Sequence, residues 1–190
     1  MPKYEVGPDD RIVVALKRPA KEAGVEKPAL TMRAPTVRDT LLADKVAKSP
    51  EEQEILLLAN LTDVTVDCIK GLRLADLNRL RQAFQAFVSA GEDEEAEVGD
   101  ADTFAVKLGR PAEDKGVPLP VLTMRAPTVG DQMAGAKGAK SAAEREIALF
   151  ASLCAVEPDT IKGLRMADYA RLQAAFRGFL AADEEDGRDD

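Results

Sequence analysis

The chain of 190 residues contains no histidine and only two cysteines. Without histidine, the sequence excludes Ser-His-Asp and Cys-His nucleophiles, histidine-based zinc sites and the usual general base near pH 7. Two cysteines, Cys68 and Cys154, are too few for a zinc site built from cysteine alone. We therefore expect neither an enzyme nor a protein with a bound metal or other cofactor.

Tryptophan is also absent and aromatic residues make up only 4% of the chain, although 45% of the residues are apolar. The core is therefore expected to be mostly aliphatic. The longest apolar runs, such as residues 55–59, are far too short to cross a bilayer, and the N-terminal segment has no apolar signal core. These observations predict a cytoplasmic protein that has no contact with a membrane.

The formal net charge of -8 comes from two acidic strings. Residues 92–102 carry seven acids and no base, and residues 183–190 carry six acids and one base. The rest of the chain therefore holds 21 of the 34 acids and 25 of the 26 bases. Such strings predict a solvated linker and a solvated tail, and they lack the ordered spacing of a calcium loop. The overall acidity argues against nucleic acid as a partner.

The sequence contains one long internal repeat. LTMRAPTV occurs at residues 30–37 and again at residues 122–129, an offset of 92 residues, and at that offset the two halves align without a gap. The repeat predicts four parts, namely a first module at residues 1–90, an acidic linker at 91–102, a second module at 103–182 and an acidic tail at 183–190. Each module is near the size at which one core folds alone.

Each module begins with a pattern typical of a β-hairpin. Residues 12–16 are rich in β-branched and apolar side chains, and Gly24 precedes a second apolar run that ends near Met32. Thr36 and Asp39 then have the spacing of a capping box, which predicts the start of a helix. The second copy repeats this pattern at the matching positions.

Further helices follow in each module. Ser49 and Glu52 predict the start of a second helix, and a short helical turn ends at Gly71. In the second copy, Gly130, Gly135 and Gly138 weaken the first helix by about 1 kcal/mol each relative to alanine. The predicted fold class is therefore α+β, with two tandem modules that each consist of an N-terminal β-hairpin followed by three to four helices.

The last helix of each module has the clearest apolar face. Its apolar residues recur at helical spacing, and they are Leu77, Leu80, Phe84, Phe87 and Val88 in the first copy and Tyr169, Leu172, Phe176, Phe179 and Leu180 in the second. The opposite side carries Arg79, Arg81 and Gln85, which we expect to face water.

Several polar residues recur at matching positions, and structural explanations are favoured for them. Arg33 with Asp39, and Arg125 with Asp131, are expected to form an ion pair or a helix cap. Asp76 and Asp168 fall in the first turn of the last helix, where a carboxylate interacts favourably with the helix dipole. Cys68 aligns with Thr160, and Cys154 aligns with Thr62, so the alignment does not support a shared redox or metal role for the two thiols.

The order of these motifs resembles the tail assembly chaperone family of long-tailed bacteriophages. The resemblance rests on L-T-M-R-A-P-T-V-x-D after the hairpin, on the apolar second helix, and on A-D-[LY]-x-R-L in the last helix. It covers both repeats and therefore most of the chain. The family pattern is usually a single module, so the duplication is a departure from it.

The resemblance implies a function and its partners. Such a chaperone binds the tape measure protein and keeps it soluble until the tail tube assembles, in the host cell cytoplasm. Further partners that the resemblance leaves open are the tail tube protein and a second copy of the chain. The alternative function is a structural tail or baseplate subunit that stays in the virion.

A chaperone of this kind needs an apolar groove for amphipathic helices. The candidate partner-binding residues are Leu56, Leu57, Leu58, Phe84, Phe87, Phe150, Phe176 and Phe179. The burial preference of phenylalanine favours a place for the four phenylalanines of the last helices in each module's own core. A client surface on the second helix remains open, because residues 56–58 are apolar on more than one face.

Overall fold

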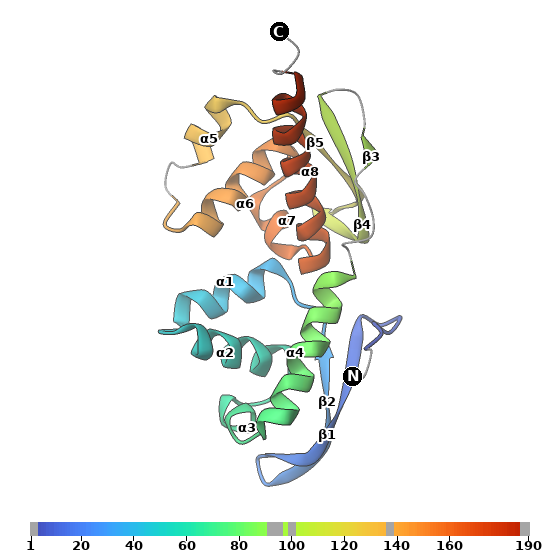
Figure 1. The fold of residues 1–190 in the computed structure, drawn as a ribbon, viewed down its shortest axis with the longest axis vertical. Helices are drawn as coiled ribbons and strands as arrows, with labels where there is room; N and C mark the ends of the chain where they lie inside the picture. The colour runs from blue at the N-terminus through green and yellow to red at the C-terminus, as the bar shows by residue number, and fades with distance from the viewer. Residues whose placement is uncertain (1–3, 91–96, 99–101, 136–138, 187–190) are drawn as a thin grey trace. The chain divides into compact units, whose positions relative to one another are not determined.

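A computed structural model of the protein describes residues 4–90, 97–98, 102–135 and 139–186. The chain divides into two compact units, Met1–Ala90 and Gly91–Asp190, which we call the first and second units. The described residues of each unit form an antiparallel hairpin followed by four helices (Figure 1). The predicted α+β class and the tandem repetition are confirmed.

The elements of the two units correspond one to one, except for one additional short strand in the second. The first unit contains β1 (Arg11–Glu22), β2 (Val25–Arg33), α1 (Val37–Val46), α2 (Pro50–Thr62), α3 (Val66–Lys70) and α4 (Leu74–Ser89). The second unit contains β3 (Glu97–Val98), β4 (Thr103–Asp114), β5 (Val117–Arg125), α5 (Val129–Gly135), α6 (Ala142–Leu153), α7 (Pro158–Gly163) and α8 (Met166–Asp186).

The first strand of each hairpin is longer than the sequence predicts. β1 pairs with β2 from Arg11 to Ala15, loses register, and pairs again from Ala20 to Glu22. Pro19 lies in this irregular stretch and has no amide hydrogen for the ladder, but the pairing resumes beyond it. The prediction ended the strand before the proline and was therefore too short. β4 has the same irregularity around Pro111.

Two residues connect the strands of each hairpin. Ala23 and Gly24 have φ angles of 48° and 81°, and Lys115 and Gly116 have φ angles of 51° and 80°. Positive φ at both central residues is the conformation of a type I′ turn, whose twist matches that of the flanking strands. The glycine in the second position avoids the strain that another side chain would meet there.

The short strand β3 lies within the segment that the sequence assigned to the acidic linker. Glu97 pairs with Ala105 and Val98 pairs with Phe104, which makes a three-stranded sheet in the order β3-β4-β5. Residues 91–96 and 99–101 of that segment lie outside the described residues. At the other end, α8 continues to Asp186, into the predicted acidic tail, and residues 187–190 lie outside the described residues.

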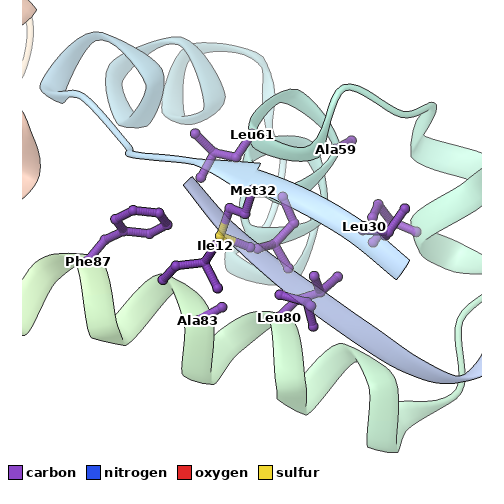
Figure 2. Close-up of a cluster of buried hydrophobic side chains, with 11 residues drawn as sticks. Ile12, Leu30, Met32, Ala59, Leu61, Leu80, Ala83 and Phe87 are labelled. Atoms are coloured by element: carbon purple, nitrogen blue, oxygen red, sulfur yellow. The ribbon is translucent and has the colours of Figure 1, made fainter. Parts of the chain in front are cut away.

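One face of each hairpin packs on the helices. In the first unit, Ile12 and Met32 on the hairpin meet Leu80, Ala83 and Phe87 of α4 (Figure 2). Leu58 and Leu61 of α2 complete this core. The matching core of the second unit includes Val106, Leu122, Met124, Ile147, Phe150, Leu172 and Phe179, all buried. Apolar residues alternate with polar ones along the strands and recur at helical spacing in α4 and α8. Each of these elements therefore buries one apolar face.

The predicted helix caps are present. The hydroxyls of Thr36, Ser49 and Ser141 each accept a hydrogen bond from a backbone amide in the first turn of α1, α2 and α6. The predicted weakness of the first helix in the second copy is also visible, since α5 has 7 residues whereas α1 has 10. Among the described residues, no helix is long and apolar enough to span a membrane.

Candidate partner-binding site

The structure divides the eight predicted partner-binding residues into two groups. The buried residues are Leu58, Phe87, Phe150 and Phe179, and the partly exposed residues are Leu56, Leu57, Phe84 and Phe176. Both groups include residues of α2, α4 and α8, so each of these helices has a buried side and a partly exposed side. The partly exposed group is the one that offers surface to a partner.

The aromatic rings of the second unit pack mainly on one another. The ring centroids of Phe150 and Phe176 lie 5.6 Å apart, as do those of Phe150 and Tyr169. Phe104 and Phe179 make an edge-to-face contact at 4.4 Å. Such contacts stabilise a core beyond the area that they bury. These phenylalanines therefore contribute to the core of their own unit, and Phe176 also retains an exposed part.

The clearest exposed apolar surface lies where the sequence analysis did not place it. On α5, Val129 is 77% exposed and Met133 is 68% exposed, and no residue of this helix is buried. We call these two residues the α5 apolar face. On α1, Leu42 and Val46 are also exposed. The two residues of each pair are four positions apart, which places both side chains on one side of a helix. This spacing can be read from the sequence without the structure.

A polar cluster fixes the junction between hairpin and helices in the first unit. Arg33 donates two hydrogen bonds to the carboxylate of Asp39, at 2.7 and 2.8 Å. The same carboxylate accepts hydrogen bonds from the amide and hydroxyl of Thr36, and from the side-chain amide of Asn60 on α2 at 2.9 Å. The predicted cap and ion pair are thus one cluster that joins β2, α1 and α2.

The second unit repeats most of this cluster. Arg125 donates two hydrogen bonds to Asp131, at 2.8 and 2.7 Å, and Thr128 donates from its amide and hydroxyl. These hydrogen bonds, first of all those from Arg125, hold the pKa of Asp131 well below its usual value. For Asp39, burial alone would raise the pKa, but hydrogen bonds from Arg33 and Thr36 outweigh burial and lower it from 3.8 to about 2.

The low pKa of Asp39 predicts a pH dependence of stability. Its folded-state pKa lies below the unfolded value, so its contribution is complete above about pH 4 and is lost as the pH falls toward 2. We expect Asp39→Asn to lower the free energy of unfolding at pH 7 by about 1–3 kcal/mol. The difference from the wild type should shrink as the pH falls from 4 to 2.

Urea unfolding at a series of pH values measures this difference. Asp44→Asn, on the exposed side of α1, is the matched control and should leave stability nearly unchanged at every pH. A difference between wild type and Asp39→Asn that stays constant from pH 7 to pH 2 would show that the carboxylate has no depressed pKa.

A second polar contact, which we call the strand clamp, joins the last helix to the irregular stretch of the hairpin. Asp76, with no exposed surface, accepts hydrogen bonds from the backbone amides of Lys17 at 2.7 Å and Arg18 at 3.4 Å. Arg79 donates to the carbonyl of Ala15 at 2.6 Å. Arg79 therefore contacts the hairpin while part of its side chain stays exposed, so it does not face water alone.

In the strand clamp of the second unit the arginine is buried as well as the aspartate. Asp168 is 1% exposed and accepts hydrogen bonds from the amide of Gly109 at 2.7 Å and from Arg171 at 2.9 Å. Arg171 is also buried and donates to the carbonyl of Lys107 at 3.3 Å. The aspartate and arginine of A-D-[LY]-x-R-L thus bind backbone groups at the stretch where the ladder of the hairpin loses register.

The end of each hairpin is attached to the short third helix. The carboxylate of Glu22 accepts hydrogen bonds from the amide and hydroxyl of Thr65, at the start of α3. Asp114 accepts from the amide of Glu157 and the hydroxyl of Thr160, at the start of α7. A carboxylate is favourable at a helix N-terminus because the free amides and the helix dipole attract negative charge.

The two thiols have no environment that would activate them. Cys68 and Cys154 are both buried and unpaired. Burial raises the pKa of Cys68 to about 11 and that of Cys154 to about 12. The thiolate is the reactive form, so the raised pKa values disfavour reaction of either thiol at neutral pH. Among the residues that the structure describes, no group of three carboxylate or thiol side chains is placed to hold a metal ion.

A comparison with protein families matches the chain twice. The sequence model of the family described as phage tail assembly chaperone proteins, E, or 41 or 14, matches residues 13–89 and residues 105–181. The chain belongs to the phage tail assembly chaperone family. Each match covers one unit of the structure, so the tandem duplication of the chaperone module is confirmed. No curated protein and no solved structure matches the chain.

Membership of this chaperone family directs attention to the surfaces that a protein partner can reach. A tail assembly chaperone acts on a protein partner, and the polar clusters described above all hold the elements of one unit together. The groups available to a partner of the chaperone include the exposed apolar side chains of α1 and α5 and the partly exposed residues of α2, α4 and α8.

Proposed function

We propose that this chaperone binds the tape measure protein and keeps it soluble until the tail tube subunits assemble around it. The observation that carries the proposal is α5, a helix that buries none of its residues and yet presents Val129 and Met133 to solvent. Large apolar side chains on an exposed helix face suit a partner that supplies an amphipathic helix.

The remaining features of the chain support the same role. Leu56, Leu57, Phe84 and Phe176 keep part of their surface exposed and would extend the contact with an apolar client. Two tandem modules allow one long client to be held at two places, which raises the overall affinity above that of either module. The net charge of -8 would keep the complex with an apolar client soluble.

Co-expression with the tape measure protein tests the proposal. We expect the tape measure protein to move from the insoluble to the soluble fraction, and to be retained when the chaperone is captured through an affinity tag. An unchanged insoluble fraction and an empty capture would refute the proposed function.

Mass spectrometry of purified virions adds a second test. A chaperone that leaves before the tail is complete is expected to be missing from virions, although abundant in the infected-cell lysate. Recovery in virions at the level of a tail subunit would favour the alternative function, a structural protein of the tail or baseplate.

A further inference from the structure

The first unit contains a cavity of about 340 Å³ that none of the functions above uses. It lies between the irregular stretch of β1 and the connection from α3 to α4. Its lining includes Arg18, Pro19, Lys21, Asp67, Leu72 and Arg73. We call it the basic pocket, because three of these six side chains are cationic and only one is anionic.

The three cations of the basic pocket are not neutralised within the structure. Arg18, Lys21 and Arg73 are exposed, and in the described part of the chain no carboxylate pairs with any of them. Neighbouring like charges repel one another, so an anion placed among them would be attracted by all three. They come from two separate segments, the first strand and the start of α4, which the fold brings to one cavity.

The second unit carries the same fold at this place without the same charge. Glu113 stands where the first unit has Lys21, and Arg110, Asp159 and Arg165 stand at the positions of Arg18, Asp67 and Arg73. Two cations therefore face two anions. Asp159 pairs with Lys162 at 2.8 Å, and both arginines are engaged in interactions within the structure. The duplicated modules have therefore diverged in the charge of this site while keeping its framework.

We propose that the basic pocket binds a carboxylate-rich segment of the client protein, an inference that rests on the proposed function. Guanidinium and ammonium groups on separate segments can each bind one carboxylate of a flexible acidic chain. Pro19 and Leu72 offer apolar surface to the methylene groups of glutamate side chains. The lining contains no aromatic ring on which a nucleic acid base could stack, so a peptide suits the pocket better than nucleic acid does.

The inference gives the two copies different tasks. The first unit supplies positive charge for an acidic part of the client, and the second unit supplies the α5 apolar face for an apolar part. A single long client that contains both kinds of segment would then bind both copies at once. Two identical modules would distinguish less well between such a client and other proteins.

Fluorescence anisotropy with the full chain tests the pocket directly. The probe is a labelled peptide of alternating glutamate and alanine, and its control is the same peptide with glutamine in place of glutamate. We expect the glutamate peptide alone to bind at low ionic strength, and added salt to weaken it because these charges are exposed. Lys21→Glu, the residue of the second copy, should weaken binding about fivefold or more, and Arg73→Gln about threefold.

Lys48→Glu is the matched control, since it makes the same charge change at an exposed site of the first unit away from the pocket. Its affinity for the glutamate peptide should stay within about twofold of the wild type. Equal binding of both peptides, or equal loss in Lys21→Glu and Lys48→Glu, would overturn the basic pocket. An apparent affinity for the glutamate peptide that falls as the protein concentration rises would also overturn the proposal. The acidic string of a second copy would then be the occupant of the basic pocket.

The same variants separate this inference from the proposed function. If Lys21→Glu loses the glutamate peptide but holds the tape measure protein as well as the wild type does, the client does not use the pocket and the inference fails alone. If the wild type binds the peptide through Lys21 but never retains the tape measure protein, the proposed function fails and the link of the pocket to that client fails with it.

Discussion

Replacing Asp168 by alanine should lower the free energy of unfolding of the second unit by about 3–5 kcal/mol. The substitution removes the buried carboxylate that pairs with the guanidinium of Arg171, and it also removes the acceptor for the amide of Gly109. Breaking a buried ion pair costs far more than breaking an exposed one. Urea unfolding followed by hydrogen exchange in α8 and α4 would assign the loss to the second unit.

Two further variants make this result specific. Asp159→Ala removes the exposed carboxylate of a pair with Lys162 on α7, and should cost less than about 0.5 kcal/mol. The double variant Asp168→Ala with Arg171→Met removes both buried charges, and should recover a large part of the stability lost in the single variant. If Asp168→Ala costs no more than Asp159→Ala, the strand clamp does not hold the hairpin to α8.

Making the α5 apolar face polar should abolish client binding without affecting the fold. The double variant Val129→Ser with Met133→Gln removes two side chains that the client would bury, a loss of about 3 kcal/mol of binding free energy, or on the order of a hundredfold in affinity. Stability should change by less than about 0.5 kcal/mol, because both side chains are already exposed. The measurement is retention of the co-expressed tape measure protein, with thermal unfolding of the variant alone.

Leu74→Gln is the control for this double variant. Leu74 is 77% exposed at the start of α4, so it matches Val129 in exposure but lies on another element of the other unit. It should retain the tape measure protein as the wild type does. Retention by the α5 double variant at the wild-type level, or an equal loss in Leu74→Gln, would show that α5 is not the client surface.

The features of this structure that the sequence predicts are determined by residues a few positions apart in the chain. The capping box of Thr36 and Asp39 spans three positions, and the apolar face of α4 repeats with the helical period, so both signals lie within one element. The duplication was equally accessible, because it requires only that the chain be compared with itself.

The contacts that the sequence did not predict join residues far apart in the chain. The amide of Lys17 and the carboxylate of Asp76 are 59 residues apart, and the amide falls in the stretch between Ala15 and Ala20 where the ladder loses register. The difference between Lys21 and Glu113 was visible in the alignment of the two copies. Its meaning required the fold, which places Lys21 beside Arg73.

The candidate partner-binding residues were also predicted only in part from the sequence. Phenylalanine at helical spacing predicts an apolar face, but the spacing does not determine whether that face meets the same module or another protein. The structure buries Phe87, Phe150 and Phe179 and leaves α5, a short helix weakened by glycine, with its apolar residues in water. A surface of this kind is recognised only after the core has been identified.

The strand β3 has a practical consequence for work on the isolated second copy. The repeat alone would suggest a fragment that starts at Thr103, but such a fragment lacks Glu97 and Val98 and exposes the edge of β4 at Phe104 and Ala105. Bare strand edges pair with other chains, so the shorter fragment would self-associate. A fragment that starts at Gly91 keeps the edge covered and is the one to purify.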